Sequence, residues 1–384
     1  MNQLYRKIIL LFFLLGVFSG NKVFSQDSSR LRISLLTCTP GEELYSIFGH
    51  SAVRIIDSNS VSDYVYNYGT FNFDDKDFYV KFIRGKLLYY VSIERFDEFQ
   101  YNYQMEGRGI TEQLLALSPL EKIKLKNALI ENLKEENKYY KYDFFLDNCT
   151  TRLRDLMADT KHPHPILPAV MPVDTKFREA IHLYLNQGEK YWSKLGIDLL
   201  LGAPTDQVMT PAQQQFLPDN LMTALDSCTN EKMVLSRRNL YYLDNPHSGE
   251  FSITPLIFFS LLLVLMIALS FFKNASVVLL LKGLDGLLFF STGLLGFLLI
   301  FMWVGTDHSM TKNNYNILWA LPTHLFASFF ISSKKNSARK YFLFSAIVSC
   351  MILLCWFFLP QKMNTALIPL VLLLFIRSAK KSYR

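Results

Sequence analysis

The chain has 384 residues, a formal net charge of +7 and a 50% share of hydrophobic residues, and its longest apolar segments crowd into the last third. That distribution excludes a wholly soluble protein and predicts a membrane-embedded part. Many lysines and arginines stand beside the apolar segments, so the positive charge does not indicate a nucleic-acid partner.

Residues 1–25 have the order of a secretory signal peptide, with two basic residues ahead of an apolar run over 8–17. Phe24 is larger than the residues that cleavage sites prefer, so an uncleaved anchor remains the alternative. In both cases residues 26–250 are expected outside the cytoplasmic membrane.

The segment 26–250 is predicted to form one α+β domain, in which a small antiparallel sheet packs against helices. Alternating, β-branched and aromatic residues predict short strands at 32–36, 52–56, 64–68 and 87–93. A capping box from Ser118 to Glu121 opens a helix that ends near residue 136. Further helices are predicted over 42–47, 149–157, 174–185, 191–201 and 211–216.

Cys149 is the first candidate for chemistry. Asn148 before it is a favoured N-cap residue, which places the cysteine on the first turn of a helix. There the helix dipole and unpaired N–H groups favour the thiolate and can hold an oxyanion. The alternative is a buried structural thiol beside a capping asparagine. Cys38 and Cys228 share the same oxidising space and could form a disulfide or remain core thiols.

His50 is the candidate base, because a thiol nucleophile needs one within reach. It is expected at the start of a sheet strand, after Gly49, which lets backbone or substrate approach closely. A histidine on a strand facing a cysteine on a helix tip is the geometry of thiol-dependent acyl transfer. The order, histidine before cysteine, resembles the circularly permuted members of the papain-like superfamily.

Several neighbours are candidate supporting residues. Asn148 could orient the thiol or an oxyanion, or act only as a cap. Such sites usually have a third residue that orients the histidine. The candidates for it are Asp143, Tyr68 and Asn67, each equally readable as a turn or core residue. Ser51, next to the histidine, is a further supporting candidate.

Four residues are candidates for contact with a lipid headgroup. Arg54 and Arg152 could bind a phosphate through two parallel hydrogen bonds, the alternative being ordinary ion pairs. Asp307 and His308 follow the second apolar segment, where they could form the floor of the site. His324, inside the third apolar segment, is costly in a bilayer and therefore a functional candidate.

Residues 251–384 are predicted to form an all-α bundle of five transmembrane helices. Their apolar runs are 255–272, 279–304, 315–331, 341–359 and 366–376, the last of marginal length. Basic residues gather in the segments that this topology places inside, 332–340 and 377–384, which is the positive-inside pattern. The remaining histidines lack the spacing of zinc ligands, so no metal site is expected.

Several motifs, taken together and in order, resemble one family. They are Thr39-Pro40-Gly41-Glu42, Phe48-Gly49-His50-Ser51-Ala52-Val53-Arg54, Tyr66-Asn67-Tyr68-Gly69, Asp147-Asn148-Cys149-Thr150-Thr151-Arg152, Asp307-His308-Ser309 and Asn314-Tyr315-Asn316-Ile317-Leu318-Trp319. An outer thiol domain followed by five apolar segments is similar to the lipoprotein N-acyltransferase family of Bacteroidota.

That resemblance implies transfer of a fatty acyl chain from a membrane phospholipid to the N-terminal amine of a diacylglyceryl-cysteine lipoprotein precursor. Cys149 would be the nucleophile and His50 the base, in a periplasmic domain of a multi-pass inner-membrane protein. A thioester is reactive enough to acylate an amine, so no cofactor is expected.

Two other readings stay open. A cell-wall peptidase or amidase of the same permuted thiol class would use the same pair on a peptide, although it would need at most one membrane anchor. A non-enzymatic membrane scaffold with an outer binding module would need no reactive thiol.

Overall fold

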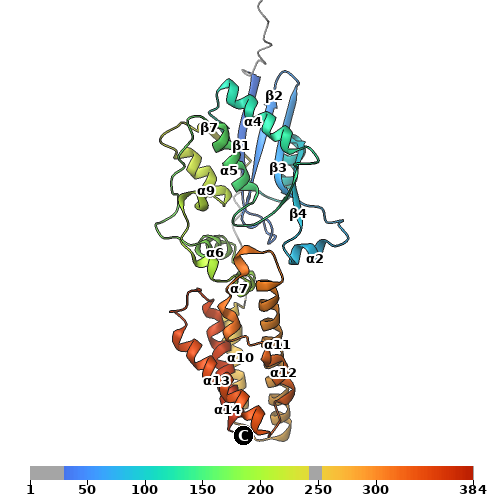
Figure 1. Ribbon diagram of the computed structural model, residues 1–384, viewed down its shortest axis with the longest axis vertical. Coiled ribbons are helices and arrows are strands. Elements are labelled where there is room, and N and C mark those ends of the chain that lie inside the picture. The colour runs from blue at the N-terminus through green and yellow to red at the C-terminus, as the bar shows by residue number, and fades with distance from the viewer. Residues whose placement is uncertain (1–29, 242–252, 384) are drawn as a thin grey trace, which may run out of the picture.

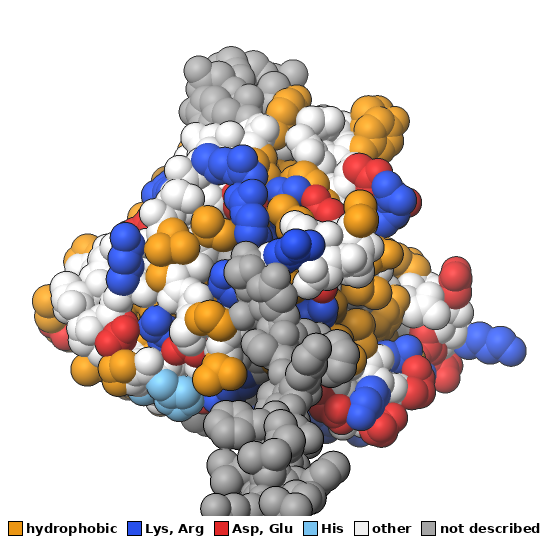
Figure 2. All heavy atoms as spheres, turned by 90° about the horizontal axis from the view of Figure 1, so that it is seen from above, with side chains coloured by type: hydrophobic (Ala, Val, Ile, Leu, Met, Phe, Trp, Pro, Cys, Tyr) orange, Lys and Arg blue, Asp and Glu red, His pale blue; other side chains and the backbone are white. Residues whose placement is uncertain are grey.

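The computed structural model describes residues 30–241 and 253–383, so the predicted signal segment 1–25 lies outside the described residues. An α+β body is followed along the chain by a helical body, and the two are stacked along the long axis of the molecule (Figure 1). Seen from the end farthest from the C-terminal helices, the α+β body shows acidic and basic side chains interspersed with apolar ones (Figure 2). No field of a single sign dominates the face in view.

The α+β body is built on one antiparallel sheet in the order β6-β4-β3-β2-β1-β5-β7. The strands are β1 (Leu31–Cys38), β2 (His50–Asp57), β3 (Ser62–Thr70), β4 (Leu88–Arg95), β5 (Ile110–Leu115), β6 (Tyr139–Lys141) and β7 (Val234–Tyr241). The α+β class and the first four strands are confirmed, but the sheet is larger than predicted. The last three strands were missed because they are short or, in β7, largely exposed and polar.

Helices cover both faces of this sheet. On one face lie α4 (Pro119–Asn132), α5 (Cys149–Thr160) and α9 (Pro218–Asp226), and on the other lies α3 (Phe96–Met105). The body also contains α2 (Phe78–Ile83), α6 (Phe177–Gln187), α7 (Tyr191–Leu200) and α8 (Pro211–Gln214). Ile33 and Leu35 of β1 pack with α4, α5 and α9, whereas Leu36 points to the opposite face and packs with Phe99 of α3. This alternation follows from the two-residue period of a strand and leaves the central strand buried on both faces.

Sequence signals placed several of these helices well. The capping box at Ser118 is formed with Glu121, and the helices predicted at 174–185, 191–201 and 211–216 correspond to α6, α7 and α8. The helix predicted over 42–47 is wrong, because that segment forms turns. The helices α2, α3 and α9 were not predicted.

The helical body contains α10 (Pro255–Leu269), α11 (Ala275–Val304), α12 (Thr323–Ala327), α13 (Asn336–Cys355) and α14 (Ile368–Ser382). Within the described ranges, α11 and α13 are long and apolar enough to cross a membrane, and α10 is apolar but shorter. The arrangement of five spans, and the domain division at residue 250, therefore stay predictions.

The third predicted span is not one helix. Residues 315–331 form two 3-10 turns and the short α12 instead. Two residues explain the break: Pro322 interrupts the helical hydrogen bonds, and Asn316 turns its amide to the Asp198 carbonyl of α7 at 3.2 Å. A continuous helix there was thus the wrong prediction, and the segment instead helps to join the two bodies.

The junction between the bodies is tight. The Gly202 N–H donates to the Met310 carbonyl at 2.8 Å, and a Cβ at position 202 would lie 1.8 Å from the Lys312 carbonyl oxygen. Only glycine permits this approach of two backbones. The segment that follows α7 is thereby fixed to the loop that follows α11.

Candidate active site

Cys149 and His50 both lie at the end of the sheet that faces the helical body. His50 is the first residue of β2, and β3 runs antiparallel to β2 and ends beside it before the chain enters α2. The loop before Cys149 is tied to the helical body, because Ser309 donates to the Asp143 carboxylate at 2.5 Å. A substrate group placed between Cys149 and His50 is therefore close to the apolar helices of the helical body.

The N-terminus of α5 is defined by its cap. The Asn148 side-chain oxygen accepts from the N–H groups of Thr150 and Thr151 at 2.8 and 2.9 Å, and the Thr151 hydroxyl accepts from the Asn148 N–H. This reciprocal box places Cys149 on the first helical residue, as predicted from the sequence. Cys149 is buried, with 9% of the residue exposed.

His50 is positioned by the residue before it. Gly49 has φ +78°, a left-handed conformation, and a Cβ there would come within 2.7 Å of the Cys38 carbonyl. A side chain at this position would be strained and would also collide with the neighbouring strand. The glycine thus lets the chain turn sharply into β2, with His50 paired to Cys38.

The thiol and the imidazole shift each other's ionisation. Burial raises the pKa of Cys149, but the charge of His50, its hydrogen bond and the Ser51 N–H outweigh burial and lower it from 9.0 to about 7. Burial lowers the pKa of His50, but the charge of Cys149 and the hydrogen bonds to Cys149 and Asn67 outweigh it and raise that pKa. Both shifts favour a thiolate–imidazolium pair near neutral pH.

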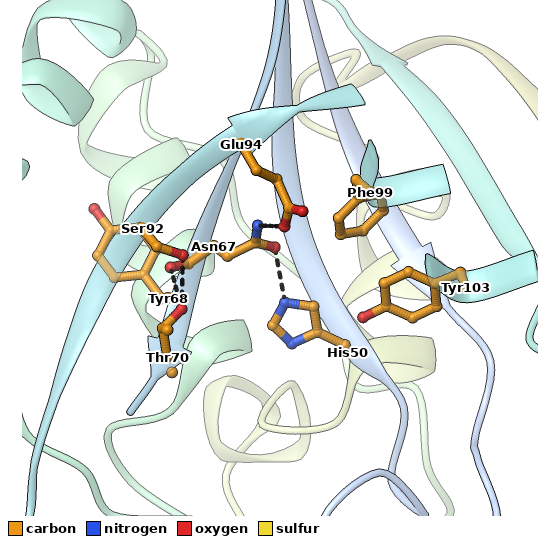
Figure 3. A pocket seen from close by; sticks show the side chains of 9 residues that line it. His50, Asn67, Tyr68, Thr70, Ser92, Glu94, Phe99 and Tyr103 are labelled. Atoms are coloured by element: carbon orange, nitrogen blue, oxygen red, sulfur yellow. Dashed lines mark hydrogen bonds between the residues drawn. The ribbon is translucent and has the colours of Figure 1, made fainter. Parts of the chain in front are cut away.

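A polar chain continues from His50 across two strands (Figure 3). His50 Nε2 lies 3.2 Å from Asn67 Oδ1, and Asn67 Nδ2 donates to Glu94 Oε1 at 2.7 Å. Because the carboxylate takes the amide donor, the amide oxygen is held toward the ring and Nε2 must be the donor. Nδ1 is then the nitrogen left to exchange a proton with the thiol.

A cavity of about 250 Å³ opens beside this chain, lined by His50, Asn67, Tyr68, Gly69, Thr70, Ser92, Glu94, Phe99 and Tyr103 (Figure 3). Gly69 has φ +90°, and a Cβ there would lie 3.6 Å from Cys149 Cβ and 4.0 Å from the Tyr140 hydroxyl. That hydroxyl is buried and has no hydrogen-bond partner among the described residues. Because Gly69 has no side chain, a space is left between Cys149 and the Tyr140 hydroxyl, a donor without a hydrogen-bond partner among the described residues.

The other supporting candidates take different places. Of the three residues considered for orienting the histidine, Asn67 contacts its ring. The Tyr68 hydroxyl accepts from Asn132, and Asp143 accepts from two N–H groups of its own loop. The Asn148 side-chain NH₂ group donates to the carbonyls of Phe144 and Phe216.

Asn148 is thereby fully used as a cap, with no group left for an oxyanion. The Ser51 hydroxyl, on β2, accepts from the Thr150 hydroxyl at 3.1 Å. Glu94 was not predicted as a residue of the site. Ser92 and Glu94 are two polar residues on one face of β4, and this spacing indicates a polar cavity beside the strand.

The headgroup candidates are already engaged. Arg54 is buried, pairs with Asp63 and Glu112, and stacks on Phe96. Arg152 makes a two-pronged ion pair with Asp147 and lies over the Tyr140 ring.

Asp307 and His308 join the two bodies. Asp307 pairs with Lys141 at 3.2 Å, and His308 Nε2 lies 3.2 and 3.1 Å from the carbonyls of Phe82 and Ile83. These contacts hold α2 and the loop before Cys149 against the end of α11.

The remaining histidine and cysteine candidates have structural surroundings. His324 is buried between Thr292 and Ser345, to which its two ring nitrogens lie within 3.2 Å. Cys38 and Cys228 are free thiols, and burial raises the pKa of Cys38 to about 12. Over the two described ranges, no group of histidine, cysteine and acidic side chains could hold a metal ion.

The lowered pKa predicts how Cys149 reacts with pH. Iodoacetamide should alkylate it half-maximally near pH 7, since only the thiolate reacts and its fraction rises with pH through that value. In His50→Ala the lowering charge is lost while burial remains, so the midpoint should move above 9. The measurement is mass spectrometry of the Cys149 peptide, with Cys38 as an internal unreactive thiol. An unchanged midpoint in the variant would contradict the coupling.

The fold and the site define a membrane-anchored protein whose outer α+β domain carries a paired cysteine and histidine. Residues 24–176 match the family model of the Lnb N-terminal periplasmic domain, and residues 246–384 match that of the Lnb transmembrane domain. Since the two matches stand in order and span most of the chain, it belongs to the Lnb family, with the architecture of a lipoprotein N-acyltransferase-like membrane protein. No curated protein and no solved structure gives a significant match.

Proposed function

We propose that the protein transfers a fatty acyl chain from a membrane phospholipid to the N-terminal amine of a diacylglyceryl-cysteine lipoprotein, through a thioester on Cys149. The observation that carries the proposal is the coupled Cys149–His50 pair at the membrane-facing end of a Lnb-type periplasmic domain. The protein would act at the inner membrane as a multi-pass enzyme, and no cofactor takes part.

In the first half-reaction the Cys149 thiolate attacks the carbonyl carbon of a phospholipid ester. The tetrahedral intermediate collapses as the bond to the glycerol oxygen breaks, and His50 Nδ1 gives its proton to that oxygen. The products are a lysophospholipid and an acyl-thioester. Asn67, held by Glu94, keeps the imidazole in the tautomer that this proton transfer needs.

In the second half-reaction the lipoprotein amine attacks the thioester carbonyl. The carbon–sulfur bond breaks, the thiolate leaves, and His50 takes the proton that the amine nitrogen loses. An ester and an amine thus become an alcohol and an amide, with atoms and charge balanced. The amide is more stable than the thioester, which drives the step.

Tyr140 is suited to stabilise the oxyanion of both intermediates. Its hydroxyl is buried without a partner and adjoins the space beside Cys149 that Gly69 leaves open. Burial and the neighbouring Cys149 raise the pKa of Tyr140, so the hydroxyl stays a donor at neutral pH. The negatively charged oxygen of the intermediate would accept a hydrogen bond from this hydroxyl, which otherwise has no partner among the described residues.

Two lipid substrates explain why the site is fixed to apolar helices. Each methylene group drawn into water costs about 0.8 kcal/mol, so a detached domain could not extract a long acyl chain. The junction of glycine and backbone contacts at residue 202 supports a site held at the bilayer surface.

The proposal is tested by mass spectrometry of a lipoprotein N-terminal peptide from cells with and without the protein. Loss of one acyl chain in its absence, restored by expression of the wild-type chain, is the expected result. Unchanged lipoprotein acylation together with altered peptidoglycan fragments would overturn it and favour a cell-wall hydrolase.

A further inference from the structure

The segment of residues 71–86, which contains α2, presents an unusual apolar surface. Phe73, Tyr79, Val80, Phe82 and Ile83 are between 46% and 76% exposed, and the last four stand on a helix of only six residues. Phe78 alone points inward and packs on Phe71 and Phe73. Clustered aromatic and aliphatic side chains of this kind mark an interaction surface rather than ordinary exposure.

The position of α2 identifies the partner. The Asp307 N–H donates to the Arg84 carbonyl at 2.9 Å, and a Cβ on Gly85 would lie 3.2 Å from the His308 backbone nitrogen. These contacts join the end of α2 to the loop that directly follows α11, an apolar helix long enough to cross a membrane. Figure 1 shows α2 near the end of α11 that faces the α+β body, which is the level at which a membrane-spanning α11 would leave the bilayer.

The charges around α2 suit a lipid surface. Arg84 and Lys86 are exposed at the end of α2 nearest α11, within reach of lipid phosphates. Asp74, Asp75 and Asp77 stand at the other end, and Asp75 is paired with Lys81 at 2.7 Å. Aromatic side chains beside basic ones are typical of segments that lie in the headgroup layer.

We infer that residues 71–86 form a lip that inserts into the outer leaflet of the membrane in which the C-terminal helices are embedded. The lip holds its exposed aromatic and aliphatic side chains among the lipid headgroups and upper acyl chains, while the sheet stays in water. The occupant of the surface is the bilayer itself.

The lip also leads to the thiol, an extension that rests on the proposed acyl transfer. Phe71 packs on Tyr89 with ring centroids 5.3 Å apart, and Tyr89 stacks on Tyr142 at 4.4 Å. A Cβ on Gly69 would lie 3.6 Å from both Tyr142 and Cys149. Aromatic contacts thus run from the lip to Tyr142, which borders the space at Gly69 beside Cys149, and they mark an apolar route for an acyl chain leaving the bilayer.

The depth of the lip is measurable without any catalysis. The full chain, with its five cysteines replaced by serine, is reconstituted in phosphatidylethanolamine–phosphatidylglycerol vesicles and given a nitroxide at Tyr79→Cys. The matched control is Val61→Cys in the β2–β3 turn, a 93% exposed apolar residue at the opposite end of the sheet. Relaxation of the label at position 79 should respond more to oxygen than to a water-soluble nickel chelate, and at position 61 the reverse. Equal nickel access at the two positions would overturn the inference.

A second arm keeps the native cysteines. Tyr79→Asp combined with Val80→Asp should lower acyl transfer from bilayer phospholipid about tenfold or more, because charged residues leave the headgroup layer. The rate of Cys149 with a water-soluble short-chain ester should stay constant, and Val61→Asp should change neither rate. Equal loss in both assays would contradict the lip. Absence of any transfer by the wild type would count against the proposed function, and the nitroxide depth would still decide the lip.

Discussion

Replacing Cys149 by serine is expected to lower acyl transfer at least about 10³-fold, because loss of the nucleophile in acyl-transfer enzymes costs up to about 10⁶ in kcat. His50 ionises a thiol whose pKa is already lowered to about 7, and it has no comparable effect on a hydroxyl. In the absence of an amine acceptor, the wild-type chain should gain the mass of one acyl group on the Cys149 peptide. Neutral hydroxylamine should remove that group, since it cleaves thioesters.

Cys228→Ser is the matched control, because Cys228 is another free thiol of the α+β body and is more exposed than Cys149. It should keep the wild-type rate, and both variants should unfold at the wild-type temperature. Full transfer by Cys149→Ser, or an acyl group found on another cysteine, would remove the thioester mechanism.

The place of Cys149 on the first turn of its helix was predictable because the signal for it is local. Asn148, Cys149 and Thr151 are near neighbours, and a capping box depends only on side chains and N–H groups of the same turn. His50 followed from a glycine and a strand pattern in the same way. Such signals need no knowledge of how strands pair.

The partners of His50 depend on strand pairing, and there the sequence was less informative. Asn67 meets Glu94 only through the register of β3 against β4, which shifts between Asn67 and Thr70. A shift of one residue would move Glu94 to the opposite face of the sheet. The sequence alone therefore could not decide which of Asp143, Tyr68 and Asn67 contacts the ring of His50.

The predicted third span failed for a related reason. Hydropathy records that residues 315–331 are apolar, but Asn316 is fixed by a carbonyl of α7, more than one hundred residues earlier in the chain. Contacts at such distance decide whether an apolar run becomes one helix or several short turns. Local composition carries no information about them.

The second large effect is expected on stability, from Arg178→Met. Arg178 is fully buried, and its guanidinium pairs with Asp206 at 3.0 Å and Asp198 at 2.8 Å. Its removal leaves the buried Asp206 without its charge partner and leaves His182 as the remaining partner of Asp198, which costs about 3–5 kcal/mol in unfolding free energy. Asp206 also accepts from the Lys362 N–H and Asp198 from Asn364, so the loss should loosen the helical body as well. Thermal unfolding in detergent micelles measures the effect.

The pH dependence separates an unpaired charge from a mere loss of packing. In the wild type, burial raises the pKa of Asp198, but His182 and Arg178 outweigh it and lower that pKa below 3.8, so this carboxylate stabilises the fold above that pH. In Arg178→Met the lowering effect of the guanidinium is lost, so burial raises the pKa of Asp198 in the folded variant. The folded variant therefore binds a proton at Asp198 more readily than the wild type, and it regains stability relative to the wild type as the pH falls. The difference in unfolding free energy between the wild type and Arg178→Met should therefore become smaller toward pH 4. Arg95→Met, at an exposed pair with Asp97, should show no measurable change at any pH. A difference at Arg178 that is constant with pH would mean that packing, and not buried charge, holds the two bodies together.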